Sequence, residues 1–128
     1  MPVDMKMNIL IVGGNEAMLE ILANMLRRLS FNNLQGASEG QKGLDKLREE
    51  EFGLIISDWY TQPMSGIQFL REVRDDAKLK HIPFIIIMAD SNSENVIAAK
   101  NASVSNLIVS PFNTETLKSK LVSVLGNF

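Results

Sequence analysis

Short runs of apolar residues alternate along this chain with segments in which apolar residues recur at helical spacing. The continuous runs have the length of single strands and consist largely of Val, Ile and Leu, a composition typical of strands that helices cover on both faces. The run around residue 35 is the weakest of them. We therefore predict strands at residues 8–12, 33–37, 54–57, 83–88 and 106–109.

Each strand-like run is followed by a segment with the pattern of an amphipathic helix. After the first run, apolar residues such as Met18, Leu22 and Met25 recur every three or four positions. Residues suited to capping a helix N-terminus stand before several of these segments, namely Asn15, Asn92 or Ser93, and Asn113. We therefore predict helices at residues 15–29, 39–50, 65–76, 93–101 and 113–125.

This alternation predicts an α/β fold, a doubly wound parallel sheet built from βα units within one domain that spans residues 1–128. In such sheets, ligands and chemistry gather at the carboxyl ends of the strands. The residues that follow the strands are therefore the first candidates for a functional site. They are Gly13, Gly14, Asp58, Trp59, Tyr60, Met88, Ala89, Asp90, Ser110, Pro111 and Phe112.

Composition and charge narrow the class of protein. The chain has 128 residues, of which 45% are hydrophobic, and a formal net charge of -2. A weakly acidic chain without a basic stripe does not suit non-specific binding of nucleic acid. The absence of cysteine excludes disulfides and thiolate metal sites, and the spacing of His, Asp and Glu does not suggest zinc. No apolar run is long enough for a membrane span or a signal peptide, so we expect a cytoplasmic protein.

The glycine pair Gly13-Gly14 ends the first predicted strand and precedes a helix, which is where phosphate-binding loops stand in nucleotide-binding folds. The local sequence GGNEAM, however, matches neither GxGxxG nor GxxxxGK[ST]. A glycine pair alone is a weak signal, so the pattern does not favour nucleotide binding.

Several stretches together resemble the receiver domain of two-component response regulators, most closely the single-domain chemotaxis regulators of the CheY type. They are LSFNN at 29–33, LIISDWYTQPMSG at 54–66, IPFIIIMAD at 82–90 and ENVIAAKNASVSNLIVSPF at 94–112. The resemblance implies a flavodoxin-like five-stranded sheet with the strand order 2-1-3-4-5. It also implies that Asp58 is the phospho-acceptor, that Pro63 and Gly66 shape the loop after it, and that Pro111 belongs to a cis-type turn.

The same resemblance implies that the phosphorylation site is degenerate. Aspartyl phosphorylation needs a carboxylate nucleophile and positive charge around the transferred oxygens. In the family, an acidic pair holds magnesium, a hydroxyl and a lysine contact the phosphoryl oxygens, and an aromatic residue of the fifth strand acts as a switch. Those positions hold Gly13 and Gly14 for the acidic pair, Met88 for the hydroxyl, Ser110 for the lysine and Leu107 for the aromatic residue.

Magnesium prefers hard oxygen ligands, and the resemblance leaves few of them in this chain. Asp58 and the backbone carbonyl of Tyr60 remain as metal ligands, so we expect weak magnesium binding or none, and no other cofactor. Glu16 is a further candidate carboxylate, although its place at a helix N-terminus has a simple structural reason. Because the lysine is missing and Met88 is apolar, we also expect a raised pKa for Asp58.

The favoured hypothesis is a receiver-type signalling module of a two-component (phosphorelay) or chemotaxis pathway that acts without phosphorylation. It would be no enzyme and would bind a signalling protein: a histidine kinase, a flagellar motor component or another effector. In the family, the docking face lies over roughly residues 94–124. The candidates for a partner surface are Trp59, Lys100, Leu107 and Lys118. We expect a monomer or a weak dimer that contacts neither membrane nor nucleic acid.

Two alternatives stay open at this point. The first is a conventional, magnesium-dependent response regulator that is phosphorylated on Asp58. The second is a flavodoxin-like binder of a small molecule, in which Gly13 and Gly14 leave room for the ligand and Trp59 lines its site.

Overall fold

A parallel sheet forms the centre of the molecule in the computed structural model, which describes residues 3–89 and 92–128 and so leaves the candidate Asp90 outside the described residues. Within them, the strands follow the order β2-β1-β3-β4-β5, and every neighbouring pair is parallel. Both the fold class and the strand order are confirmed. The strands are β1 (Ile9–Val12), β2 (Leu34–Ala37), β3 (Leu54–Asp58), β4 (Phe84–Met88) and β5 (Asn106–Val109).

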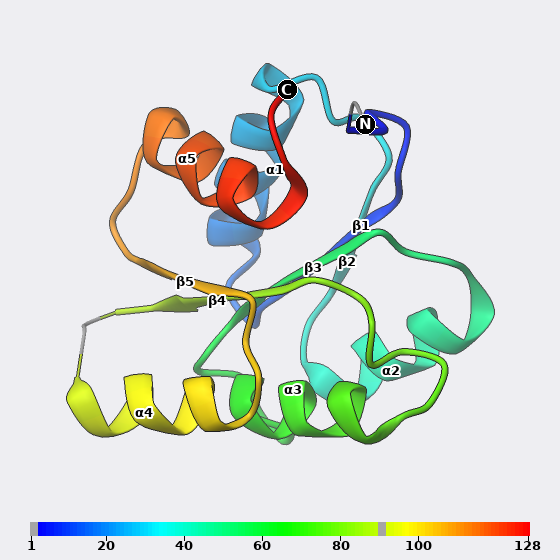
Figure 1. The fold of residues 1–128 in the computed structure, drawn as a ribbon, viewed down its shortest axis with the longest axis vertical. Coiled ribbons are helices and arrows are strands. Elements are labelled where there is room, and N and C mark those ends of the chain that lie inside the picture. The colour runs from blue at the N-terminus through cyan, green and yellow to red at the C-terminus, as the bar shows by residue number, and fades with distance from the viewer. Residues whose placement is uncertain (1–2, 90–91) are drawn as a thin grey trace.

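Helices cover both faces of this sheet (Figure 1). Helices α1 and α5 lie on one face, and α2, α3 and α4 lie on the other. This two-sided cover explains why the strands are apolar without alternation. The helices are α1 (Glu16–Arg28), α2 (Gly40–Glu49), α3 (Gly66–Asp75), α4 (Ser93–Asn101) and α5 (Thr114–Leu125).

Asparagine side chains cap three of the helices, as the sequence predicts. The Oδ1 atom of Asn15 accepts a hydrogen bond from the N–H of Met18 at 3.2 Å. At α4 the cap is Asn92 rather than Ser93, and at α5 it is Asn113. Each cap satisfies backbone N–H groups that have no partner inside the helix, and so fixes where the helix begins.

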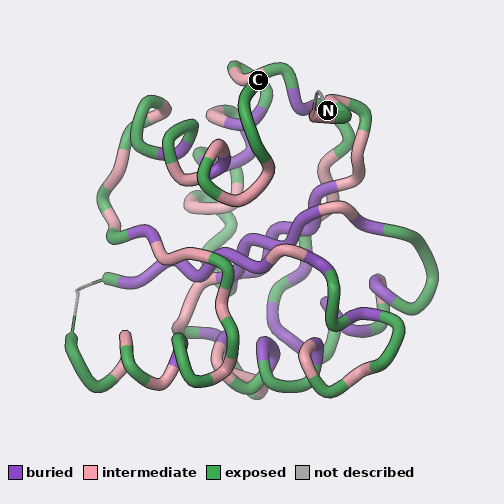
Figure 2. Tube along the Cα trace, in the orientation of Figure 1, coloured by how far each residue is buried: buried purple, intermediate pink, exposed green. Residues whose placement is uncertain are grey.

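The core has two parts, one on each face of the sheet, because successive strand residues point to opposite sides. In β4, Ile86 and Met88 pack with the helices of the α2, α3 and α4 face, whereas Ile85 and Ile87 pack toward α1 and α5. Figure 2 shows the buried positions running along the strands at the centre of the molecule. Among the helices of the described residues, none is long and apolar enough to cross a membrane.

The predicted end of the third strand is one residue too early. The strand extends to Asp58, which pairs with Ile87 of β4, and the following N–H of Trp59 still donates to the Ile87 carbonyl at 2.9 Å. Ladder hydrogen bonds to a fully buried neighbour outweigh the low strand propensity of aspartate. As a result, the backbone of Asp58 is held by the hydrogen bonds of the sheet.

Candidate functional site

Asp58 stands at the carboxyl edge of the central strand, half-buried between the loops that follow β1 and β3. Its Oδ1 atom accepts a hydrogen bond from the backbone N–H of Tyr60 at 3.2 Å. The loop after it closes where the N–H of Gly66 donates to the Trp59 carbonyl at 2.9 Å. Backbone hydrogen bonds therefore fix both the carboxylate and the loop that follows it.

The loop after β3 depends on a glycine at its end. A Cβ atom on Gly66 would lie 2.2 Å from the carbonyl oxygen of Asp58 and 2.9 Å from the Cα atom of Trp59. Only a residue without a side chain permits this close approach of α3 to the strand end. Ser65 then opens α3 with a reciprocal capping box that involves Gln68.

Two prolines of this edge of the sheet follow cis peptide bonds. The bond between Ser110 and Pro111 is cis, in agreement with the turn that the resemblance implies, and so is the bond between Gln62 and Pro63. The Ser110 N–H donates to the carbonyl of Met88 at 2.7 Å. The backbone of the loop after β5 is thus tied to the end of β4.

Gly13, which directly follows β1, lies beside Asp58. The glycine is buried, and its N–H donates to the Ala37 carbonyl at 3.0 Å. A Cβ atom on it would lie 3.7 Å from the Cβ of Asp58 and 2.8 Å from the Cε methyl of Met18. Gly14 is exposed, and its nearest neighbour in that test is the carbonyl oxygen of Ser38 at 3.8 Å. The sequence position of Gly13 thus faces Asp58, and the space between them is apolar.

The other three positions that the resemblance assigns to the site, Met88, Leu107 and Ser110, carry no charge. Met88 is 1% exposed and packs in the core on the α2, α3 and α4 face. Leu107 of β5 is half-buried and packs against the same cluster. Ser110 is half-buried and uncharged at neutral pH.

The electrostatics of Asp58 follow from this environment. Burial raises the pKa of its carboxyl above the ordinary value, while hydrogen bonds from the N–H groups of Tyr60 and Trp59 act in the opposite direction. No charged side chain of the described residues is among the causes. The raised pKa is the predicted direction, and its physical cause is desolvation.

The described donors do not fit the oxygen cage that magnesium prefers. Beside Asp58 stands Gly13, which has no side chain, and next to it the methyl of Met18. Glu16 is exposed in the first turn of α1, where a carboxylate favours the helix dipole. Over residues 3–89 and 92–128, no group of three or more His, Asp or Glu is placed to hold a metal ion.

The residues proposed for a partner surface lie in three places. Trp59 is half-buried, and together with the 54%-exposed Tyr60 and with Gly14 it borders a hollow of about 400 Å³ next to the end of β3. Lys100 is exposed near the end of α4. Lys118 of α5 lies on the opposite side of the sheet, with its Nζ atom 5.3 Å from the centre of the Phe128 ring.

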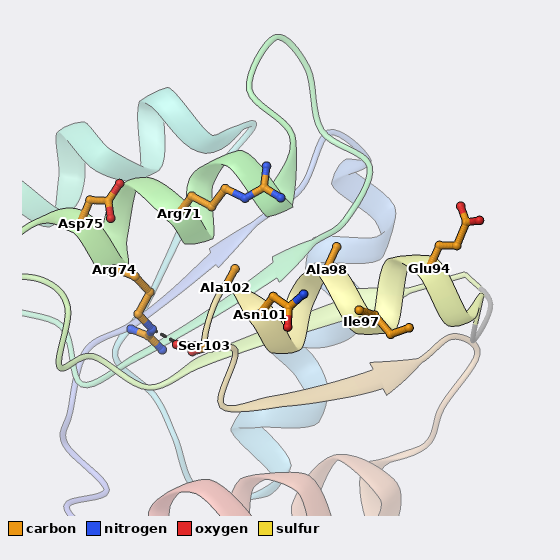
Figure 3. Close-up of a pocket in the computed structure, with 9 residues that line it drawn as sticks. All are labelled: Arg71, Arg74, Asp75, Glu94, Ile97, Ala98, Asn101, Ala102 and Ser103. Atoms are coloured by element: carbon orange, nitrogen blue, oxygen red, sulfur yellow. Dashed lines mark hydrogen bonds between the residues drawn. The ribbon is translucent and has the colours of Figure 1, made fainter.

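A second hollow, of about 700 Å³, lies between α3 and α4 (Figure 3). Ile97 is 58% exposed at its border, and Arg71 has no hydrogen-bond or ion-pair partner within the described part of the chain. Arg74 instead donates to the carbonyls of Ser103, at 2.9 Å, and Ile82, at 2.7 Å. These residues escaped the sequence analysis, although the run Val-Ile-Ala-Ala inside α4 is a signal, because a helix that buries one face must expose part of such a run.

Comparison with known proteins agrees with the fold. A family model described as the response regulator receiver domain matches residues 9–122. The chain is 42% identical over 115 residues to chemotaxis protein CheY-3 of Vibrio cholerae, a match that covers 90% of this chain and 88% of that protein. It is 36% identical over 118 residues to chemotaxis protein CheY of Pseudomonas aeruginosa, over 92% of this chain and 95% of that one.

A solved structure points the same way. The chemotaxis response regulator CheY4 of Vibrio cholerae superposes with a TM-score of 0.86 at 26% identity, over 94% of this chain and 99% of that chain. The match to the family model, the level of identity and the shared fold have one explanation. The chain belongs to the receiver domain family of response regulators, with CheY-like proteins of chemotaxis among its relatives.

Proposed function

We propose that this receiver domain signals by protein binding and does not need phosphorylation. The observation that carries the proposal is the setting of Asp58, which is half-buried beside a side-chain-free Gly13 and the methyl of Met18. Phosphoryl transfer concentrates negative charge, and the enzyme or receiver that promotes it has to place opposite charge there. The described surroundings of Asp58 supply backbone N–H groups and apolar atoms.

The expected loss of reactivity is large. By analogy with the removal of a single oxyanion donor, each missing electrostatic contact costs about 2–4 kcal/mol in the transition state. The positions of Gly13, Met88 and Ser110 each lack such a contact. Even with non-additive effects, the rate of phosphorylation falls by several orders of magnitude. The proposal therefore includes weak magnesium binding at most and no enzymatic activity.

The docking face that we propose centres on α4 and the edge strand β5. Ile97 of α4 and Val109 of β5 are large apolar residues that are 58% and 44% exposed. Lys100 adds a positive charge to this face. Exposed apolar residues beside a charged rim are typical of protein-binding surfaces.

The names of the CheY relatives support a chemotaxis partner: the histidine kinase, a flagellar motor component or another effector. The proposal includes a cytoplasmic location and a module that is monomeric or weakly dimeric.

The first test measures the response of the wild-type site to magnesium and a phosphoryl analogue. Trp59 adjoins Asp58 and is the only tryptophan, so its fluorescence reports on this site alone. We expect no saturable change when magnesium is added to millimolar concentration, followed by beryllofluoride or a small phosphodonor. Asp58→Asn is the matched control. Saturable quenching that disappears in Asp58→Asn would overturn the proposal.

Saturable quenching of this kind would favour a conventional phospho-receiver, and one observation supports that alternative. Asp58 is retained at the end of the central strand, and the loop after it keeps its closing hydrogen bond between Gly66 and Trp59. Mass spectrometry of the intact protein after incubation with the phosphodonor would then show one added phosphoryl group.

The second test concerns the docking face. Ile97→Glu is expected to weaken binding to a chemotaxis kinase or motor-switch protein from the same organism by at least about tenfold, because burying the new charge costs more than about 1.4 kcal/mol. Ile21→Glu is the control, since Ile21 on α1 is 57% exposed and lies on the other side of the sheet. Equal losses from both substitutions, or none from Ile97→Glu, would place the docking face elsewhere.

A further inference from the structure

We propose that the side chain of Met18 closes the acceptor site from within, by filling the space beside Asp58 that the missing side chain of Gly13 leaves. A cation or phosphodonor then meets a thioether methyl where the family carries a carboxylate. This inference rests on the proposed function and gives it a structural device: the site lacks charge and is also plugged.

The contacts around Gly13 carry the argument. The position of a Cβ atom on Gly13 lies 2.8 Å from the Cε methyl of Met18, 3.4 Å from Cδ2 of Leu19 and 3.7 Å from Cβ of Asp58. Real Cβ atoms do not approach other carbons to 2.8 Å, so the methyl of Met18 already occupies that volume. All three neighbours are hydrocarbon groups, which means that the wall of the site beside Asp58 is apolar.

The start of α1 explains why Met18 lies there. Met18 is the third residue of the helix, and its N–H is held by the cap of Asn15. Side chains of a helix lean toward its N-terminus, so a residue in the first turn covers the loop that precedes the helix. That loop contains Gly13. An unbranched thioether chain can bend into such an irregular space.

The plug has a consequence for the restoration of the site. Magnesium takes hard oxygen ligands and keeps part of its water shell. A thioether has only a soft sulfur atom to offer as a ligand, and its methyl group occupies space that water would need. Returning carboxylates to positions 13 and 14 therefore rebuilds only part of the site, because the Met18 side chain still has to leave. Since the methyl is the far end of a flexible chain, its removal is expected to matter by several-fold and not by orders of magnitude.

The experiment compares three variants for magnesium affinity by calorimetry and by Trp59 fluorescence. The first carries Gly13→Asp with Gly14→Asp, the second adds Met18→Ala, and the third adds Met25→Ala instead. Met25 is a half-buried methionine of the same helix that packs against the core on the α1 and α5 face. We expect Met18→Ala to tighten magnesium binding about three- to tenfold, and Met25→Ala to leave it unchanged. Equal affinities in all three variants would overturn the plug.

A measurement in the otherwise unchanged chain keeps the test valid if the acidic variants do not fold. Nuclear Overhauser effects from the Met18 methyl to the Hα atoms of Gly13 are measured in the wild type, with the Met25 methyl as the control. We expect a contact to Gly13 from the Met18 methyl and none from the Met25 methyl, because only Met18 occupies the space beside Gly13. An absent contact from Met18 would refute the plug and leave the proposed function standing, whereas magnesium binding by the wild type would refute both.

Discussion

The loops after β3 and after β1 meet at Asp58, yet they differ in what they retain. The loop after β3 keeps the backbone contacts that position Asp58: the cap at Ser65, the hydrogen bond from Gly66 to Trp59, and the close approach of Gly66 to the strand end. The loop after β1 has Gly13 and Gly14 where the family carries acids, and the space beside Gly13 is taken by Met18. The loop after β3 therefore keeps its backbone geometry, and under the proposed function the loop after β1 lacks the charged side chains that phosphorylation needs.

The difference between the two loops separates what the fold requires at this site from what phosphorylation requires there. Backbone contacts such as those of Gly66 stabilise the fold, because the loop after β3 leads directly into α3, whose buried side chains belong to the core. Carboxylates beside Asp58 serve only reactivity, since burying like charges together costs stability. A domain that functions as a binding module would keep the first set and lose the second. The comparison thus agrees with the proposed function and can be tested loop by loop.

The strongest way to break this comparison is to place a methyl group at the end of the β3 loop. Gly66→Ala puts a Cβ atom 2.2 Å from a backbone oxygen, and neither partner can move without shifting the strand end or α3. We expect a loss of about 3 kcal/mol in the free energy of unfolding, at the upper end of overpacking effects. Urea denaturation followed by Trp59 fluorescence and by circular dichroism measures it.

Gly14→Ala is the control in the loop after β1. A Cβ on Gly14 would meet only the Ser38 carbonyl, at the ordinary distance of 3.8 Å, so the free energy of unfolding is expected to change by less than about 0.5 kcal/mol. Similar losses from the two substitutions would mean that both loops are under the same geometric constraint, and the contrast between them would fail.

Much of the fold could be predicted because its signals are local. Continuous apolar runs located the strands, and side chains such as Asn15 and Asn113 located two helix starts, since a cap depends on residues only a few positions away. The error at the end of β3 arose because strand pairing with Ile87 is a long-range contact. Local propensity carries no information about such a partner.

The sequence could predict which residues lie together in the candidate site, but it could not predict which side chain occupies the space between them. Parallel strands bring their carboxyl ends to one edge, so Gly13 and Asp58 had to be neighbours once the fold was known. The place of Met18 depends on a side-chain conformation, and its helical spacing predicts only a core residue. Lys118 shows the same limit, because its contact with the ring of Phe128 depends on the path of the chain after α5, which the helical pattern does not predict.

A smaller effect than that of Gly66→Ala is expected from the charge of Asp58 itself. Because burial raises its pKa in the folded state, the carboxyl keeps its proton to a higher pH in the folded protein than in the unfolded chain. Ionisation therefore destabilises the fold: the wild type loses stability as the pH rises from the unfolded value, about 4, through the folded pKa. Below both values the carboxyl is protonated in both states and contributes nothing.

Asp58→Asn removes this ionisation while its amide oxygen can still accept the hydrogen bond from the Tyr60 N–H. We expect the variant to be more stable than the wild type at neutral pH by less than about 1 kcal/mol, since a half-buried carboxyl remains partly screened by water. The gain should vanish at a pH below about 4. Urea denaturation at both pH values, with the exposed Asp45→Asn as a control for the loss of one negative charge, measures it. A wild type more stable than Asp58→Asn at neutral pH would mean that the fold favours the ionised carboxylate. The surroundings of Asp58 would then stabilise negative charge, in contrast to the apolar wall that Gly13 and Met18 form.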